Sequence, residues 1–220
     1  MRAELTARLN RIAETAGRYS VPGSTLIDVG SDHGLLSVYC LRNDMFERAV
    51  LTDINQGPAD RSLAAIRENL LEDRAEVMVT DGLSGVPVGD NDVIVIAGMG
   101  GNNIRDIIGR FMEDHPEFPS GVRFILQPQK SVPELREWLS DKGFEIKDED
   151  AVYEAGFYYC VLVVEYIGTV TGLSDEEIYY GPRMLEKLDR YPDYRDFLER
   201  VFEMRARGDT RLKKVLEERS

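Results

Sequence analysis

Residues 27–36 read IDVGSDHGLL, and this stretch decides how the chain is expected to fold. An apolar run stops at Gly30, and a helical pattern starts a few residues later. A strand, a glycine turn and a helix in this order form the phosphate cradle of dinucleotide-binding enzymes. Here, however, Asp32 stands in the place of the middle glycine, and a carboxylate repels phosphate. The stretch therefore predicts the turn of a nucleotide-binding sheet and raises the question of which ligand accepts an acid there.

Five short apolar runs precede two longer strand-like runs in the chain. Each of the five is followed by a helical segment or by a turn leading to one, which predicts a parallel sheet covered by helices on both faces. The last two runs are joined at Ala155-Gly156 with no helix between them, so we expect them to pair antiparallel. The predicted fold is α/β and Rossmann-like, with a mixed, mostly parallel seven-stranded sheet that ends in an antiparallel hairpin. The expected strands are 25–30, 49–54, 76–81, 92–98, 123–128, 144–154 and 157–167.

Helix signals divide the rest of the chain. Apolar residues at helical spacing predict an amphipathic helix over 3–16. From the capping box of Ser174 and Glu177 onward the pattern is helical. We therefore expect a Rossmann-like domain with its N-terminal helix over residues 1–172 and a helical appendage over 173–220. Other expected boundaries are Pro58 in a first helical turn, Asn102 or Asn103 and Ser131 as N-caps, Asp32 as the cap of a helix beginning near His33, and Gly143 as a helix end.

The composition excludes several classes of protein. With 220 residues, 43% of them hydrophobic, the chain suits one good-sized core plus a tail. Its longest apolar runs are too short to cross a bilayer, so we expect a soluble, cytoplasmic monomer with no membrane contact. Cys40 and Cys160 lie in apolar contexts and are expected to be buried, reduced thiols. Because His33 and His115 are isolated, no metal site is expected.

The charge is unevenly distributed along the chain. The net charge is −13, which disfavours nucleic acid at first sight because an acidic surface repels phosphates. Residues 1–20, however, carry four arginines against two glutamates, and residues 183–220 carry 11 basic and 9 acidic residues. A polyanion would therefore approach through the two ends of the chain.

Acids follow the second and third expected strands. In an open parallel sheet the ligand lies beyond the carboxyl ends of the strands, where the strand order reverses. Asp53 at the end of the second strand would accept hydrogen bonds from both hydroxyls of a ribose. Asp81 at the end of the third would meet the amine of an adenine ring. A solvated aspartate and a turn-forming Asp-Gly remain alternatives for these two positions.

Asp32 discriminates between adenosine cofactors. S-adenosylmethionine offers an ammonium and a sulfonium, both cationic, whereas NAD offers a diphosphate, so Asp32 favours the former. As a cap, the aspartate would also serve the helix that follows. His33 would hold the cofactor carboxylate or line the substrate side, and a packed histidine is an equal alternative.

Three further stretches have alternative interpretations. IAGMGG at residues 96–101 would let a flat ring approach the backbone without meeting a Cβ atom, although a glycine-rich turn into a helix looks similar. The aromatic run at residues 157–159 would offer a stacking face, but packing in the sheet is the better interpretation. The acidic triplet at residues 148–150 is expected to be a solvated strand or turn.

The motifs DVGSDHGLL, DINQGP, DGL, IAGMGG, FILQP and REWL occur here in one order. In this respect the chain resembles the bacterial tRNA (adenine-22, N1)-methyltransferases, which are Rossmann-like S-adenosylmethionine enzymes with a helical C-terminal appendage. It differs from them at Ser37, where the family has proline, and at Gln129, where it has asparagine. The resemblance implies a cofactor site made of Gly30, Ser31, Asp32, Gly34, Asp53, Ile54, Asp81, Gly82, Ala97, Gly98 and Met99. It also implies tRNA as partner, with Gly100, Gly101, Gln127, Pro128, Arg8, Arg11, Arg183 and Arg190 on the substrate side.

Methylation of adenine N1 requires no general base from the protein. Adenine N1 has a lone pair and no proton to lose, so no general base is required, and Asp32 and His33 are the only catalytic candidates. No Asn/Asp-Pro-Pro-aromatic motif, expected for methylation of exocyclic amines, follows the fourth strand. The predicted activity is transfer of a methyl group from S-adenosylmethionine to N1 of an adenosine in tRNA, at position 22. The alternatives are a methyltransferase acting on a small molecule or protein, and a dinucleotide-binding dehydrogenase or non-catalytic nucleotide-binding module.

Overall fold

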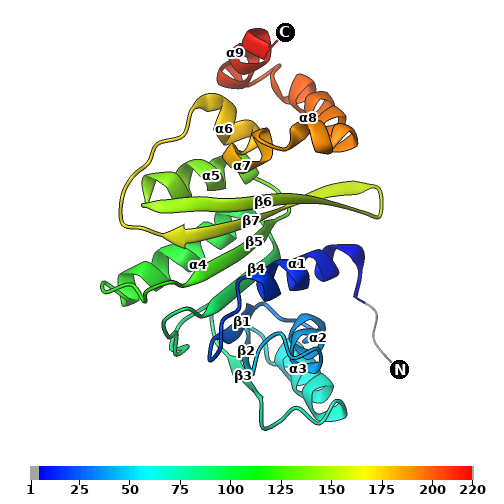
Figure 1. The fold of residues 1–220 in the computed structure, drawn as a ribbon, viewed down its shortest axis with the longest axis vertical. Helices are drawn as coiled ribbons and strands as arrows, with labels where there is room; N and C mark the ends of the chain where they lie inside the picture. The colour runs from blue at the N-terminus through cyan, green and yellow to red at the C-terminus, as the bar shows by residue number, and fades with distance from the viewer. Residues whose placement is uncertain (1–4, 220) are drawn as a thin grey trace.

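The fold alternates strands and helices as far as residue 141, except that no helix separates the third strand from the fourth, and then changes character (Figure 1). The sequence prediction that a helix or a turn leading to one follows every strand is therefore wrong at this one connection. The structure is a computed structural model that describes residues 5–219. A hairpin and a run of short helices complete the chain. The elements are α1 (Ala7–Arg18), β1 (Thr25–Val29), α2 (Leu35–Arg42), β2 (Arg48–Asp53), α3 (Gln56–Glu68), β3 (Ala75–Val79), β4 (Val93–Met99), α4 (Gly101–Asp114), β5 (Arg123–Pro128), α5 (Val132–Asp141), β6 (Phe144–Glu154), β7 (Phe157–Tyr166), α6 (Asp175–Tyr180), α7 (Pro182–Leu185), the 3₁₀ helix η1 (Leu188–Arg190), α8 (Pro192–Arg205) and α9 (Thr210–Arg219).

The seven strands form one sheet in the order β3-β2-β1-β4-β5-β7-β6. Strands β1 to β5 are parallel, and β7 pairs antiparallel with both β5 and β6. The chain runs outward from β1 to β3, then returns to the other side of β1 to make β4. The strand order therefore reverses between β1 and β4, which is where an open sheet binds its ligand. The mixed, mostly parallel sheet predicted from the sequence is confirmed.

Helices cover both faces of the sheet, as its nearly continuous apolar strands require. One core packs α4 and α5 against the sheet, and a second packs α1, α2 and α3 against the opposite face. Helices α6 to α9 build a third core with Ala151 of β6, and they gather at one end of the molecule (Figure 1). The predicted boundary at residues 172–173 falls in the loop between β7 and α6.

Several predicted helix starts are wrong by a few residues. Helix α4 begins at Gly101 with Gly100 as its N-cap, so Asn102 and Asn103 lie inside its first turn and cap nothing. Helix α2 begins at Leu35 with Gly34 as its N-cap, so Asp32 is not its cap. Both N-caps are glycines without a side-chain cap, Gly34 in the left-handed region and Gly100 in extended backbone.

Other helix ends agree with the prediction in part. Ser131 is the N-cap of α5, but its side chain makes no capping hydrogen bond. The capping box of Ser174 and Glu177 is present with both of its hydrogen bonds. Helix α1 spans Ala7–Arg18, two residues beyond the predicted end, and residues 1–4 lie outside the described residues.

The acidic triplet is the clearest correction, because Glu149 is completely buried and Asp150 nearly so. Arg136 of α5 donates from Nε to Glu149 Oε1 at 2.8 Å and from Nη1 to the main-chain oxygens of Ile178 and Tyr179. The second oxygen, Glu149 Oε2, accepts the main-chain N–H groups of Arg183 and Met184 at the start of α7. One buried ion pair thus joins α5, β6 and the helical region.

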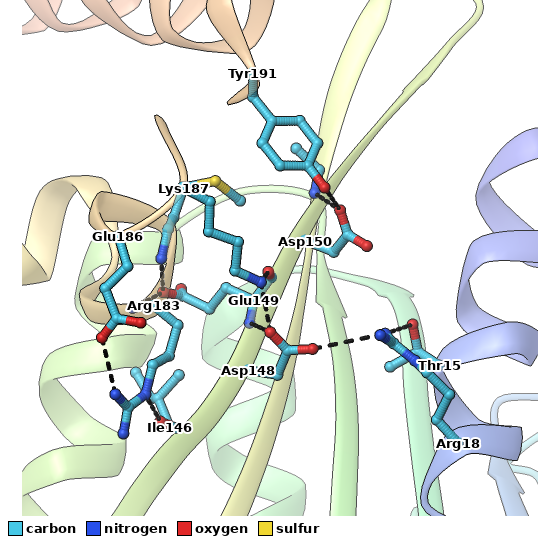
Figure 2. A network of polar contacts seen from close by, with 12 residues as sticks. Thr15, Arg18, Ile146, Asp148, Glu149, Asp150, Arg183, Glu186, Lys187 and Tyr191 are labelled. Carbon is cyan, nitrogen blue, oxygen red and sulfur yellow. Dashed lines mark hydrogen bonds and ion pairs between the residues drawn. The ribbon is translucent and has the colours of Figure 1, made fainter. Parts of the chain in front are cut away.

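The flanking acids of the triplet are also paired, as Figure 2 shows. Asp148 accepts a hydrogen bond from Lys187 Nζ and lies 3.6 Å from Arg18 of α1. Asp150 accepts the hydroxyl of Tyr191 at 2.8 Å (Figure 2). The triplet therefore fastens the C-terminal helices to the sheet and to α1.

Substitution of Glu149 by glutamine tests the buried pair. We expect Glu149→Gln to lower the free energy of unfolding by about 3 to 5 kcal/mol, because it leaves the Arg136 guanidinium buried without its counter-charge. The double variant Arg136→Met/Glu149→Leu is expected to lose less than the single one. Glu217→Gln, in an exposed pair with Lys213, is the control and should change stability by less than about 0.5 kcal/mol. Urea denaturation measures all three, and a loss below 1 kcal/mol for Glu149→Gln would contradict this role.

Candidate functional site

A cavity of about 310 Å³ opens at the carboxyl ends of β1, β2 and β4, at the reversal of strand order. Its lining combines apolar walls with three carboxylates and one guanidinium. Six of the eleven predicted cofactor residues lie in it, from three strand ends and the loop after β3. The lining residues are Val29, Gly30, Asp53, Ile54, Asp81, Gly82, Met99, Asn103, Asp106, Ile107 and Arg110.

Gly30 is required by the backbone conformation of the turn after β1. Its φ is +73°, a conformation that residues with a Cβ atom rarely adopt. A Cβ atom at this position would also meet Met99 Cε, the flexible end of that side chain. The main-chain N–H of Gly30 donates to Thr52 O at 2.8 Å, which ties the turn to β2.

Asp53 and Asp81 place negative charge at two points of the cavity. Asp53 is half-buried and accepts the N–H of Asn55 on Oδ1, while Oδ2 has no partner among the described residues. Asp81 accepts a hydrogen bond from Arg110 Nη2 at 2.9 Å, and both side chains are about half exposed. Asp53 therefore has an oxygen free to accept a ligand hydroxyl, whereas Asp81 shares its charge with Arg110.

Residues 31–34 of the turn between β1 and α2 are held by α3 and are not part of the cavity lining. Asp32, at φ +50°, forms an ion pair with Arg61 of α3 and lies 3.6 Å from His33 Nε2. The Ser62 hydroxyl donates to the main-chain oxygen of Asp32 and lies 3.0 Å from the hydroxyl of Ser31. The Asp32 carboxylate is thus already partnered by a cation of the protein, a contact that the sequence does not reveal.

Gly34 completes this turn by packing. It is buried, and a Cβ atom there would lie 3.1 Å from Leu51 Cδ2 and 3.3 Å from Ser62 Cα. Binding roles for Ser31, Asp32, His33 and Gly34 stay predictions.

The glycines of IAGMGG serve different purposes. A Cβ atom on Gly101 would collide with Ser131 O of the β5–α5 loop, so that position requires glycine, whereas one on Gly100 would meet only the flexible end of the Lys130 side chain. Gly98 is exposed, and a Cβ atom there would be in ordinary van der Waals contact with Arg8 Nη1 and Gln129 Nε2, both at 3.8 Å. The approach of a flat ring to Gly98 stays a prediction.

Helix α4 contributes four lining residues that the sequence analysis missed: Asn103, Asp106, Ile107 and Arg110. They stand at positions i, i+3, i+4 and i+7, so they occupy one face of the helix. This spacing is visible in the sequence. It indicates a face of the cavity only when α4 is known to begin at Gly101, beside the ends of β1 and β4.

The predicted substrate-side arginines differ in their surroundings. Arg8 donates to Gln127 Oε1 and pairs with Glu154, and Arg11 pairs with Asp150. Gln127 and Pro128 are buried at the end of β5. Arg183 pairs with Glu145 and Glu186. Among the residues the structure describes, Arg190 is exposed and its guanidinium has no hydrogen-bond or ion-pair partner.

A larger hollow of about 890 Å³ lies at the opposite edge of the sheet. It is lined by the amino ends of β1, β2 and β3, including Thr25, Arg48 and Ala75. Ligands of open parallel sheets bind at the carboxyl edge, so the smaller cavity is the candidate site despite its size.

Three expectations from composition concern the whole chain. Cys40 and Cys160 are buried and free, and burial raises the pKa of each thiol to about 12. Within residues 5–219, no helix has the length and apolar character needed to cross a bilayer. The same residues bring together no cluster of three or more side chains suited to a metal ion.

Comparison with known proteins gives the family of this chain. The sequence model of the tRNA (adenine(22)-N(1))-methyltransferase family matches residues 26–205. A tRNA (adenine(22)-N(1))-methyltransferase of Bacillus subtilis is 32% identical over 158 residues, which are 72% of this chain and 65% of that protein. The chain belongs to this family. The resemblance drawn from the sequence motifs is confirmed.

Solved structures agree with the assignment. A Streptococcus pneumoniae protein described as a candidate tRNA (m1A22) methyltransferase, in complex with S-adenosyl-L-methionine, has a TM-score of 0.78 and 28% identity, with 97% of this chain and 99% of that chain covered. The Bacillus subtilis M1A22 tRNA methyltransferase has a TM-score of 0.74 and 27% identity, with 98% and 95% covered. The Rossmann-like methyltransferase fold is thereby confirmed, and the cofactor predicted here is the one bound in the S. pneumoniae relative.

Asp28 of β1 is a buried acid two residues before Gly30. Burial raises its pKa from 3.8 to about 6, although the Ser37 hydroxyl, which donates to Oδ2 at 2.8 Å, opposes the shift. Because the pKa is higher in the folded state than in the unfolded chain, the folded state binds more protons between these values. Ionisation of Asp28 therefore lowers stability as the pH rises from about 4 to above 6.

Asp28→Asn removes this penalty. We expect it to raise the free energy of unfolding at pH 7.5 by about 1 to 3 kcal/mol relative to the parent, and by much less at pH 4. Chemical denaturation across this pH range measures the difference. Asp73→Asn, on an exposed turn, is the control and should give no pH-dependent difference. A constant difference between Asp28→Asn and the parent from pH 4 to 7.5 would contradict the burial argument.

Proposed function

We propose that this chain transfers a methyl group from S-adenosylmethionine to N1 of an adenosine in tRNA, at position 22. The observation that carries the proposal is the cavity at the reversal of strand order, in a chain of this family, with an acid at the end of β2 and a glycine turn after β1. The S. pneumoniae relative with the same fold binds this cofactor. A tRNA substrate also fits the predicted cytoplasmic location.

The lining residues suit an adenosine cofactor. Asp53 offers Oδ2 to a ribose hydroxyl. Ile54 is 61% exposed at the cavity, although a large apolar side chain is normally covered, and with Ile107 it would cover a purine ring. Gly30 and Gly82, both at positive φ, bring backbone close to the cavity. These residues would hold the adenosine half of the cofactor, and Asp81 would accept a hydrogen bond from the exocyclic amine of the adenine.

The protein's part in the reaction is mainly to bind and orient. When bound, S-adenosylmethionine supplies an electrophilic methyl group carried on a sulfonium. Because adenine N1 has no proton to lose, the chain needs no base, and none of its carboxylates has to accept a proton. The exposed Gly98 gives a base a point of approach, and the carboxylates of the site favour positive charge as it passes to the adenine. Orientation alone contributes up to about 7 to 11 kcal/mol of barrier reduction in such reactions.

Asp32 and His33 are proposed to face the methionine end of the cofactor. Asp32 forms its ion pair with Arg61 on the exposed rim, with the two side chains 57% and 46% exposed. An exposed pair of this kind is worth about 1 kcal/mol or less, so a cationic ligand would compete for the carboxylate at little cost. The pair is therefore compatible with the predicted role.

The product nucleoside tests the proposal. Unmodified tRNA and a variant tRNA with guanosine at position 22 are incubated with the protein and methyl-labelled S-adenosylmethionine, then digested to nucleosides. We expect label in N1-methyladenosine from the first tRNA only. Label in N6-methyladenosine, or transfer only to a small molecule or protein, would contradict the proposal. Binding of NAD without binding of S-adenosylmethionine would place the chain with the dehydrogenases.

Asp53→Ala tests the ribose contact. We expect it to weaken binding of S-adenosylmethionine by about 1 to 3 kcal/mol, because the ribose hydroxyls lose their acceptor. Isothermal titration calorimetry measures the affinity. Asp73→Ala, which removes an acid from the hollow at the opposite edge, is the matched control and should bind as the parent does. Equal affinities of all three proteins would place the cofactor elsewhere.

Of the arginines predicted to contact tRNA, Arg190 has the guanidinium that is free to bind a phosphate among the described residues. We expect Arg190→Ala to weaken tRNA binding and to reduce the slope of log K against log salt concentration by about 0.7 to 0.9, the share of one phosphate contact. Arg67→Ala, in the exposed part of α3, is the control for loss of one positive charge. Filter binding at several salt concentrations measures both, and an unchanged slope for Arg190→Ala would remove η1 from the docking surface.

A further inference from the structure

Arg8, at the start of α1, makes contacts that reach the end of β4. Its main-chain N–H donates to Glu154 Oε2 at 2.7 Å, and its Nε lies 3.6 Å from Glu154 Oε1. Its Nη1 donates to Gln127 Oε1 at 2.8 Å, and the guanidinium lies 5.7 Å from the centre of the Tyr159 ring. The side chain is 20% exposed, so most of it is enclosed by β5, β6 and β7.

Gln127 connects Arg8 to Gly98, because its side-chain oxygen accepts hydrogen bonds from both residues. The side chain is fully buried, and its Oε1 also accepts the N–H of Gly98 at 3.2 Å. At this point the β4–β5 register shifts between Ala97 and Met99, and Gly98 has a φ of +76°. Gln127 thus holds the irregular turn that ends β4.

The direction of the Gln127 amide is set by its donors. The Arg8 guanidinium and the Gly98 N–H are both donors only, so the oxygen must face them. The Nε2 group then donates to Pro128 O at 3.1 Å. Without Arg8, the oxygen would lose one of its two donors, and the amide would be less firmly oriented toward Gly98.

We infer that Arg8 is a positioning residue that fixes the Gly98 turn through Gln127, and that it is not the phosphate contact its position in a basic N-terminal helix predicts. The inference rests on the proposed function, because the exposed Gly98 is the point at which the acceptor base would approach. Glu154 supports it: burial opposes ionisation, but the contacts of Arg8 and Thr6 lower its pKa, so a carboxylate balances the Arg8 charge. A guanidinium balanced in this way attracts a phosphate weakly.

The planar fork of arginine is required for this geometry. One nitrogen reaches Gln127 while another faces Glu154, and the ammonium of lysine offers a single point of contact. Lysine would nevertheless keep the positive charge and bind a phosphate. Arg8→Lys therefore separates positioning from phosphate binding, and Arg18→Lys is the matched control, because Arg18 is on the same helix and 54% exposed.

The first measurement is steady-state kinetics with tRNA and S-adenosylmethionine. We expect Arg8→Lys to lower kcat by roughly 10- to 100-fold, since a small misplacement near the reacting atoms has an effect of this size. The tRNA affinity and its salt slope should stay as in the parent, and Arg18→Lys should change neither. Full kcat in Arg8→Lys, or a tRNA affinity that Arg8→Ala loses and Arg8→Lys restores, would overturn the inference.

A double-mutant cycle tests whether Arg8 acts through Gln127. Gln127→Met keeps the volume of the side chain and removes the acceptor. We expect the kcat of the double variant Arg8→Lys/Gln127→Met to be no lower than that of Gln127→Met alone. Additive losses of kcat would show that the two residues act independently.

Amide hydrogen exchange gives a readout that does not depend on activity. Arg8→Lys is expected to speed exchange of the Gly98 amide relative to the parent and to Arg18→Lys, with the melting temperature little changed. Unchanged exchange at Gly98 would overturn the inference even if the parent methylates tRNA. Absence of N1-methyladenosine with the parent protein would instead overturn the proposed function, and exchange at Gly98 would still decide the role of Arg8.

Discussion

The parallel pairing of β1 with β4 is the constraint on which the site depends. Leu26–Val29 lie in register with Val93–Ile96, and the order of strands reverses between these two. Because the connections leave the sheet in opposite directions here, their helices leave a space above the two strand ends. Gly30, Met99 and Asp53 line this space together with residues of α4. The positions of the candidate cofactor residues follow from this one adjacency.

A second interaction joins the helical region to the sheet. The Arg136–Glu149 pair is buried on both sides, and its other hydrogen bonds go to main-chain groups of α6 and α7 and to Cys160 Sγ of β7. A buried pair of this kind adds little net stability compared with apolar packing, but loss of one partner is strongly destabilising. The pair connects α5 and β6 to α6 and α7 of the C-terminal helices, among which lies Arg190, the proposed tRNA contact.

Much of the fold could be predicted from local pattern. Apolar runs of strand length separated by helices predict the parallel sheet, and the uninterrupted pair of long strands predicts the hairpin. Asp53 and Gly30 could be predicted for the same reason, because a residue directly after a buried strand lies at a known edge of the sheet. In these cases the pattern of apolar residues, together with the rule that ligands bind at the carboxyl ends of parallel strands, is enough to make the prediction.

The rest depends on partners far apart in the chain. Nothing near Glu149 shows that Arg136 lies against it, so three consecutive acids look like a solvated turn. Asp32 and Arg61 are 29 residues apart, and Arg8 and Gln127 are 119 apart. Charge counts treat arginines as free, whereas in the basic ends Arg8, Arg11 and Arg183 are paired with Glu154, Asp150 and Glu145. The basic ends of the chain are therefore less available to tRNA than their composition indicates.

The carboxyl edge at β1 and β4 is proposed to hold S-adenosylmethionine. Hydrogen exchange measured by mass spectrometry, with and without this ligand, tests the proposal most directly. We expect slower exchange in residues 29–33, 53–54, 81–82 and 98–103 when the ligand is present. Protection confined to the opposite edge, around Thr25, Arg48 and Ala75 in the larger hollow, would contradict it.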